Sequence, residues 1–259
     1  MSNEEVPAAV VSYGAADVPE SWELVARALA PRFRVEVPRR LPGIDPVMQL
    51  ATIIDAHEVA PIVVGHSYGG LIARSAAACS VHPVAGLVLV DATSARAASS
   101  RAARAALTAA ALGLDVASVL ADGRIGRLLL DHGLPLVPEQ RAFRRAVDAE
   151  HYTAWHDAIR RGIADGTAAN ELDAVIPAAA RAAVLGPSSA PIAVVHSSSL
   201  TRRLERPLPE ATRRVENVTA TGDRFHNIHL VHPVAIAAAV RTVAEEARMS
   251  AARNVARAA

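Results

Sequence analysis

Along much of the chain, short apolar runs rich in valine and isoleucine alternate with longer stretches of helical spacing. The runs predict six β-strands, at residues 8–12, 34–37, 61–65, 85–90, 191–195 and 213–219. Most of these runs are apolar without alternation, which is typical of strands buried on both faces. The segments between and after them predict helices at residues 21–30, 46–57, 69–79 and 233–248. Strands that alternate with helices favour an α/β fold with a mostly parallel central sheet of about six strands.

One long interval, residues 92–189, breaks this rhythm because it contains no strand-like run. It is rich in arginine and in alanine, the strongest helix former. Its glycines are expected to divide it into separate helices, with breaks at Gly113, Gly123, 133–135, Gly162, Gly166 and 186–187. An insertion that returns before the penultimate strand predicts a helical cap over the sheet. We therefore expect a core of residues 1–91 and 190–259 and a cap of residues 92–189, with the tail from Met249 frayed.

Composition narrows the class of protein. With 259 residues, of which 51% are hydrophobic, the chain can bury the core of one large domain. A formal net charge of +1 provides no broad field for nucleic acid or acidic membranes, so neither is expected as a partner. No apolar run approaches the roughly 20 residues that span a bilayer, and the first residues lack the order of a secretory signal. We expect a cytoplasmic protein.

Residue identity excludes several kinds of chemistry. All 27 basic residues are arginine, so no lysine can form a Schiff base, and the usage of arginine and alanine suggests a bacterial gene. Cys79 is the single cysteine, which rules out an intramolecular disulfide, and its apolar surroundings predict a buried, inert thiol. The chain has no H-E-x-x-H motif or cysteine cluster, so we expect no metal and no cofactor.

A G-x-S-x-G pattern lies at Gly65-His66-Ser67-Tyr68-Gly69, directly between a predicted strand and a predicted helix. A strand that reverses sharply into a helix forces the serine into a strained backbone conformation and exposes its hydroxyl. Side chains in place of Gly65 and Gly69 would collide with the tight turn. The N-terminus of the helix points at the serine, which leaves the Tyr68 N–H available to a developing oxyanion. The pattern predicts that Ser67 is a nucleophile.

The sequence Gly-His-Ser-Tyr-Gly-Gly-Leu-Ile-Ala-Arg at residues 65–74, followed by Val-Ala-Gly-Leu-Val-Leu-Val-Asp-Ala at residues 84–92, resembles the α/β-hydrolase superfamily. It is similar to bacterial esterase-like, single-domain members that use a Ser-His-Asp triad. The resemblance extends from Val10 to Val243 apart from the cap, and the chain begins at what relatives count as their third strand. It implies the α/β-hydrolase fold, whereas the motifs carry little information on the substrate.

A serine hydroxyl needs an adjacent base, and the resemblance implies a histidine in the loop before the proline that opens the final helix. Among the 10 histidines, His226 matches this place because Pro233 follows it by seven residues. His229 is the alternative, although packing on the final helix suits it better. His66 lies inside the serine turn, where a structural role is favoured over a catalytic one.

In the commonest family arrangement the acid of the triad follows the strand expected at 191–195, but no carboxylate appears there until Glu205. The preceding strand ends in Asp91, whose carboxylate can also reach the histidine from the C-terminal edge of the sheet. We therefore expect Asp91 to orient His226, with Glu205 as the substitute. Asp223 is close to His226 in sequence, which places it on the same loop and not across from the ring.

The resemblance implies a second oxyanion donor in the loop after the first core strand, here Tyr13-Gly14-Ala15-Ala16. By position the donor is the Ala15 N–H, with Gly14 allowing the turn and Tyr13 in place of the usual histidine. The residues expected to bind the substrate are Tyr13, Gly14, His66 and Phe225. Arg39 or Arg40 could hold an acidic substrate, but a solvated surface pair is the favoured interpretation of both.

These residues predict a serine hydrolase that cleaves an ester, lactone or thioester of a small hydrophobic molecule through an acyl-enzyme on Ser67. The resemblance leaves open a non-hydrolytic cyclase, acyltransferase or lyase of natural-product biosynthesis and, with less support, a non-catalytic small-molecule binder. Haloalkane dehalogenases and epoxide hydrolases of this fold use an aspartate where Ser67 stands, which argues against both. An exposed apolar face on the cap would favour a homodimer.

Overall fold

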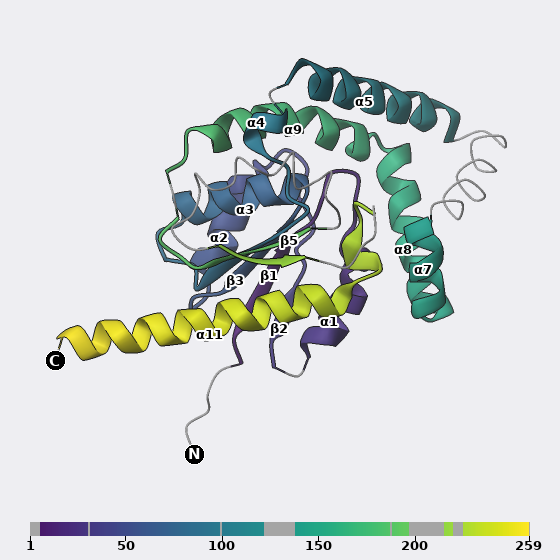
Figure 1. Cartoon of the computed structure of the whole chain (residues 1–259). Coiled ribbons are helices and arrows are strands. Elements are labelled where there is room, and N and C mark those ends of the chain that lie inside the picture. The colour runs from purple at the N-terminus through teal and green to yellow at the C-terminus, as the bar shows by residue number, and fades with distance from the viewer. Residues whose placement is uncertain are drawn as a thin grey trace.

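The computed structural model describes residues 6–30, 32–98, 100–121, 138–186, 188–196, 215–219 and 225–258. Its centre is a six-stranded sheet in the order β2-β1-β3-β4-β5-β6, in which every neighbouring pair is parallel (Figure 1). The strands are β1 (Ala8–Ser12), β2 (Arg34–Glu36), β3 (Ile62–His66), β4 (Gly86–Val90), β5 (Ile192–His196) and β6 (Val215–Thr219). Each strand begins within two residues of its predicted start, so the predicted α/β fold is confirmed.

Helices cover both faces of the sheet (Figure 1). One face packs against α2 (Pro46–Asp55) and α3 (Tyr68–Cys79), the other against α1 (Glu23–Leu29) and α11 (Pro233–Ala258). Successive strand residues point to opposite faces. In β3, Val63 packs with α2 and α3, whereas Val64 packs with α1 and α11, and both are fully buried. Apolar contacts on both faces explain why the four inner strands, β1, β3, β4 and β5, show no polar alternation.

Five helices of the described chain lie between β4 and β5, and we call them the cap helices. They are α4 (Ala95–Ala98), α5 (Arg101–Ala121), α7 (Pro138–Ala146), α8 (Ala149–Ala164) and α9 (Thr167–Ala183). α9 packs against α3 of the core, and α5 packs in turn on α9 and α8 (Figure 1). The helical insertion therefore precedes the penultimate strand, as the sequence predicts.

Two of the expected breaks between cap helices are wrong. Gly113 lies inside α5 and Gly162 lies inside α8. A Cβ at either position would meet nothing within 4 Å. A glycine in such open surroundings weakens a helix by about 1 kcal/mol relative to alanine, which does not have to end it. Gly166, by contrast, does separate α8 from α9, with a φ of 75° that favours glycine.

The last helix and the single cysteine also differ from expectation. α11 continues past Met249 to Ala258 instead of fraying, and Figure 1 shows its C-terminal end extending beyond the sheet. Cys79 is exposed, because it is the last residue of α3 and lies beyond the part of that helix that packs on the core. None of the described helices has the length and the apolar character needed to cross a membrane.

Candidate active site

Ser67 lies in the sharp turn between β3 and α3. Its backbone angles are φ 50° and ψ −122°, outside the regions that non-glycine residues ordinarily occupy. Hydrogen bonds fix this conformation: the Ser67 N–H donates to the Val90 carbonyl at 3.1 Å. The Ser67 carbonyl accepts from the Gly70 and Thr93 N–H groups at 3.0 Å each. A turn strained in this way is typical of an exposed nucleophile.

Both glycines of the serine pattern face close backbone contacts. A Cβ on Gly69 would lie 1.9 Å from the carbonyl oxygen of Ser12, at the end of β1. A Cβ on Gly65 would lie 2.7 Å from the Cα of Gly70. These distances are well inside van der Waals contact, and the opposing atoms belong to the backbone, which cannot move aside without shifting β1 or α3. The turn therefore needs glycine at both positions, for the steric reason inferred from the sequence.

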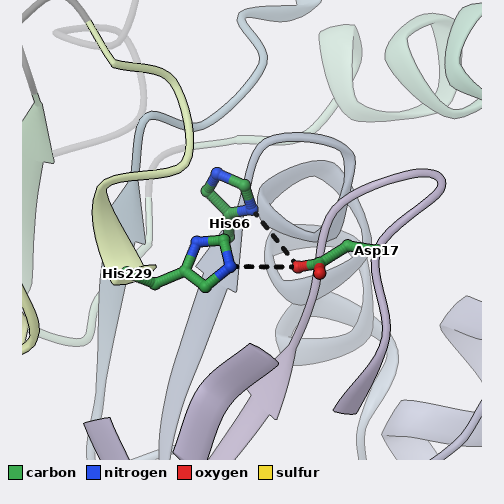
Figure 2. A group of neighbouring side chains, drawn as sticks. All are labelled: Asp17, His66 and His229. Atoms are coloured by element: carbon green, nitrogen blue, oxygen red, sulfur yellow. Dashed lines mark ion pairs between the residues drawn. The ribbon is translucent and has the colours of Figure 1, made fainter. Parts of the chain in front are cut away.

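A buried polar network lies beside the serine turn (Figure 2). The Oδ2 atom of Asp17 lies 3.4 Å from Nε2 of His229 and 3.9 Å from Nδ1 of His66. Trp22 donates its Nε1–H to the same oxygen at 3.4 Å and stacks on His229, with ring centroids 4.7 Å apart. The Nε2 atom of His66 lies 3.1 Å from the carbonyl oxygen of His226, to which it can donate. The network thus connects the serine turn, the loop after β1 and the segment that carries His226.

Burial keeps the two imidazoles of this network neutral. His66 is 1% exposed and His229 is 0% exposed. Burial, followed by the repulsion that protonated His229 and His226 would exert, lowers the pKa of His66 to about 3. Burial, followed by the charge of His226, also lowers the pKa of His229 to about 3. His66 therefore offers almost no surface to a substrate, and its position suits a structural link.

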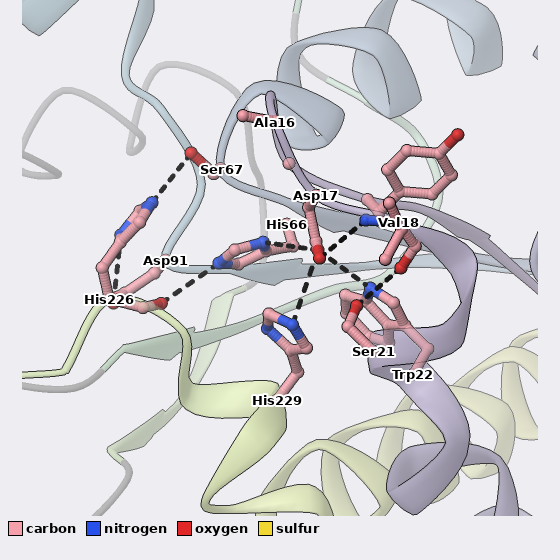
Figure 3. A network of polar contacts seen from close by, with 12 residues as sticks. Ala16, Asp17, Val18, Ser21, Trp22, His66, Ser67, Asp91, His226 and His229 are labelled. Carbon is pink, nitrogen blue, oxygen red and sulfur yellow. Dashed lines mark hydrogen bonds and ion pairs between the residues drawn. The ribbon is translucent and has the colours of Figure 1, made fainter. Parts of the chain in front are cut away.

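Three of the predicted site residues converge on the outer side of this network (Figure 3). The Nε2 atom of His226 lies 2.9 Å from Ser67 Oγ, and its Nδ1 atom lies 3.6 Å from Asp91 Oδ2. The Asp91 side chain is fully buried, whereas that of His226 is 53% exposed. An imidazole between a hydroxyl and a carboxylate can take the hydroxyl proton at Nε2 while its Nδ1–H faces the carboxylate.

The loop after β1 lies against the serine turn. A Cβ on Gly14 would lie 3.0 Å from Nδ1 of His66 and 3.4 Å from the Cβ of Ser67. Ala15 follows directly and is partly buried against the core around α2 and α3. On the helical side of Ser67, Tyr68 begins α3, and the first N–H groups of a helix have no partner within it. The Ala15 and Tyr68 N–H groups are therefore the candidates for an oxyanion site.

A sequence model of the alpha/beta hydrolase family matches residues 10–248. The chain belongs to the alpha/beta hydrolase family. Solved structures share its fold: MenH from S. aureus is 14% identical with a TM-score of 0.60, covering 95% of this chain and 96% of that one. Cfl2 from Burkholderia cenocepacia is 19% identical with a TM-score of 0.66, covering 93% of this chain and 88% of that one.

A loop variant of the haloalkane dehalogenase DbeA from Bradyrhizobium elkanii is 15% identical, with a TM-score of 0.57, covering 97% of this chain and 93% of that one. No curated protein matches the sequence. At these identities the similarity concerns the fold alone. The prediction of the alpha/beta hydrolase family from the residues around Ser67 is confirmed.

The remaining predicted pocket residues of this alpha/beta hydrolase have distinct environments. Tyr13 is buried, and its hydroxyl accepts a hydrogen bond from the backbone N–H of Arg40 at 3.0 Å. Burial raises the pKa of the Tyr13 phenol, so it is protonated at neutral pH. Phe225 is partly buried directly before His226. Tyr13 also lines a cavity of about 190 Å³ between the loop after β1 and the cap helices α8 and α9.

The interpretation of Arg39 and Arg40 as a solvated surface pair is wrong for Arg40. Arg39 is exposed and pairs with Glu20. The Arg40 side chain is only 14% exposed, and its Nη1 atom lies 2.6 Å from Oε1 of Glu171 on the cap helix α9. The two neighbours differ because Arg40 points into the junction between core and cap, where Glu171 is the nearest countercharge.

The buried network also has the spacing of a metal site. Among the described residues, the ligand atoms of Asp17, His66 and His229 lie within 4.8 Å of one another, close enough to hold one ion. No fourth His, Cys, Asp or Glu of the described chain joins them. Asp17 already accepts the Trp22 N–H, and His66 Nε2 faces a backbone carbonyl. We therefore interpret the group as a structural network of this alpha/beta hydrolase.

Sequence reasoning missed two residues that border the site. Asp17 follows the loop after the first strand by one residue, and this position could have singled it out as a neighbour of the serine turn. Glu171 is the fifth residue of the cap helix α9, where no sequence pattern marks it. The alternative acids Glu205 and Asp223 lie outside the described residues.

Proposed function

We propose that this alpha/beta hydrolase is a serine hydrolase that cleaves an ester, lactone or thioester of a small hydrophobic molecule. The observation that carries the proposal is the contact of 2.9 Å between His226 Nε2 and Ser67 Oγ, with Asp91 on the other side of the imidazole. A hydroxyl becomes a useful nucleophile when a base can take its proton as it attacks. The strained turn that presents Ser67 supports the same role.

In the acylation step, Ser67 Oγ attacks the carbonyl carbon of the substrate while His226 Nε2 takes the hydroxyl proton. The carboxylate of Asp91 stabilises the imidazolium that forms. The N–H groups of Tyr68 and Ala15 bind the negative oxygen of the tetrahedral intermediate. The bond between the carbonyl carbon and the leaving oxygen or sulfur then breaks, and His226 gives its proton to the leaving alcohol or thiol.

In the deacylation step, a water molecule replaces the leaving group. His226 takes a proton from this water as it attacks the acyl carbon, and the second tetrahedral intermediate uses the same two N–H groups. Collapse of the intermediate releases the carboxylic acid and returns the proton to Ser67. The exposed side of His226, which is 53% accessible, gives water a route to the imidazole.

We propose that residues 92–189 act as a cap that shapes the substrate pocket over Ser67, with Tyr13, Gly14 and Phe225 near its edge. The described cap helices contribute mainly apolar and alanine side chains to their packing on the core. A cap of this composition favours a hydrophobic acyl or alcohol group.

The proposed function is tested by turnover of p-nitrophenyl esters of increasing acyl length, with intact mass after rapid quenching to detect an acyl group on Ser67. We expect turnover by the wild type, a transient acyl-enzyme, and loss of both in S67A. An exposed serine of the cap provides the control. Ser100→Ala removes a hydroxyl that accepts the Ala103 N–H at the start of α5, so it should keep wild-type turnover. A wild type that forms the acyl-enzyme but never hydrolyses it would instead point to transfer or cyclisation chemistry.

A further inference from the structure

A single carboxylate of the cap holds the loop that contains the proposed oxyanion donor. Glu171, on α9, accepts a hydrogen bond from the Ala16 N–H at 2.8 Å through Oε2. Its other oxygen, Oε1, accepts from Arg40 Nη1 at 2.6 Å. The Glu171 side chain is 12% exposed and that of Arg40 is 14% exposed, so water competes little for either contact.

Arg40 holds the same loop from its carbonyl side. Its Nη1 donates to the Gly14 carbonyl at 3.1 Å, and its Nη2 donates to the Tyr13 carbonyl. The guanidinium carbon also lies 4.1 Å from the centre of the Tyr13 ring and 5.1 Å from that of Tyr68. A planar guanidinium can satisfy several acceptors and two aromatic faces at once, which a lysine ammonium cannot.

These contacts determine the orientation of the peptide group that carries the proposed donor. The Gly14 carbonyl and the Ala15 N–H belong to one planar peptide group, in which they point in opposite directions. Arg40 therefore fixes the direction of the Ala15 N–H by holding the Gly14 carbonyl. Glu171 fixes the next peptide group through the Ala16 N–H, and Ala16 has a φ of 57°, a conformation that a non-glycine residue needs support to keep.

We propose that Arg40 and Glu171 are positioning residues that hold the Ala15 N–H in place for the oxyanion, and that the oxyanion site is complete only while α9 is docked on the core. This inference rests on the proposed serine hydrolase function. Glu171 belongs to the cap, whereas Arg40 and the loop belong to the core. Movement of α9 away from the core would remove the acceptor for Ala16 and the countercharge of Arg40 in one step.

The chain offers a matched control on the same cap helix. Arg181, also on α9, pairs with Asp45 at the start of α2, with 3.0 Å between Nη1 and Oδ2. This pair also joins α9 to the core, but it is about half exposed and does not contact the loop of residues 13–16. R181Q removes an ion pair between cap and core without changing the contacts of the proposed oxyanion donor.

Three variants separate positioning from general stability. E171Q keeps an oxygen that can accept the Ala16 N–H but removes the charge that pairs with Arg40. The double variant R40M/E171L removes both charges together, so that neither remains buried and unpaired. R181Q is the control. For each, thermal unfolding reports folding, and kcat and KM are measured on a p-nitrophenyl ester.

The readout specific to the oxyanion is the ratio of kcat for an ester to kcat for the matching thionoester, in which sulfur replaces the carbonyl oxygen. A well-placed N–H donor favours oxygen over the larger, weaker acceptor sulfur. We expect R40M/E171L to lower kcat on the ester about 10- to 100-fold, with KM changed little, and to lower the ratio. E171Q should lie between this variant and the wild type, and R181Q should match the wild type in both measurements.

Two results would overturn the inference while leaving the proposed function intact. In the first, the wild type turns over esters and the folded R40M/E171L variant keeps both its kcat and its oxygen-to-sulfur ratio. In the second, R181Q loses as much kcat as R40M/E171L, which would assign the effect to docking of α9 alone. Failure of the proposed function is distinct, since the wild type itself would then turn over no ester.

Discussion

The Nε2 atom of His226 lies 2.9 Å from Ser67 Oγ, although 159 positions of sequence separate the two residues. The contact forms because the turn after β3 and the segment before the final helix meet at the same edge of the parallel sheet. Asp91, directly after β4, reaches the same edge. Ligands and reacting groups of open α/β sheets gather at the carboxyl ends of the strands, and the proposed triad follows this rule.

Asp91 should be needed for the rate and not for the fold. Its carboxylate faces His226 Nδ1 at 3.6 Å, so Asp91→Asn exchanges an acceptor of the Nδ1–H for an amide that can face the ring with its NH₂ group. We expect kcat on an ester to fall on the order of 10³- to 10⁴-fold. Asp115→Asn, at an exposed position of α5, is the control. Full activity in Asp91→Asn would remove Asp91 from the triad and direct attention to Glu205.

The glycines of the chain should divide into two classes. Gly69→Ala places a Cβ 1.9 Å from the Ser12 carbonyl oxygen, so we expect severe destabilisation or failure to fold. Gly113→Ala, inside α5, meets nothing within 4 Å and should stabilise the protein by up to about 1 kcal/mol. Urea unfolding of both variants checks the contrast. A Gly69→Ala protein as stable as the wild type would be incompatible with the close approach of α3 to β1.

Stability should decrease in mild acid because the buried imidazoles of His66 and His229 are neutral. Burial lowers the pKa of each to about 3, whereas an unfolded histidine has a pKa of about 6.5. The unfolded chain therefore binds more protons below pH 6.5. Above pH 6.5 the two imidazoles should not reduce the free energy of unfolding. Between about pH 6.5 and 3 this free energy should fall as the pH falls, by up to about 1.4 kcal/mol per pH unit for each imidazole.

The measurement is urea unfolding at several pH values between 7.5 and 5. His229→Phe keeps a ring to stack on Trp22 but cannot bind a proton, so it should reduce the slope by about half if the two imidazoles contribute equally. His82→Gln, at an exposed position, should leave the slope unchanged. An identical slope in His229→Phe and the wild type would rule out His229 as a source of the pH dependence.

Local sequence patterns were sufficient to predict the fold. The residues of the proposed triad were predicted from local patterns together with the resemblance to the α/β-hydrolase superfamily. Ser67 is marked by flanking glycines between a strand and a helix, Asp91 by its place at the end of an apolar strand, and His226 by the proline that opens α11. Each signal depends on residues that are neighbours in sequence. Apolar runs likewise predicted the strands, because a strand buried on both faces consists mainly of apolar residues.

Contacts between distant segments could not be predicted in this way. Arg40 and Glu171 are 131 positions apart, and neither lies in a motif, so the sequence alone favoured a solvated position for Arg40. The same limit applies to Cys79, because an apolar run on a helix does not reveal which of its residues extend past the core. Gly113 was expected to break a helix that tertiary packing of α5 on α9 preserves.

The central claim, that Ser67 is a nucleophile activated by His226, is tested most directly by labelling with a fluorophosphonate probe read by intact mass. The account predicts one label on the wild type, none on S67A, and labelling of H226A slowed by about 10²-fold or more. A wild type that takes no label, or an S67A protein that is labelled as fast as the wild type, would contradict it.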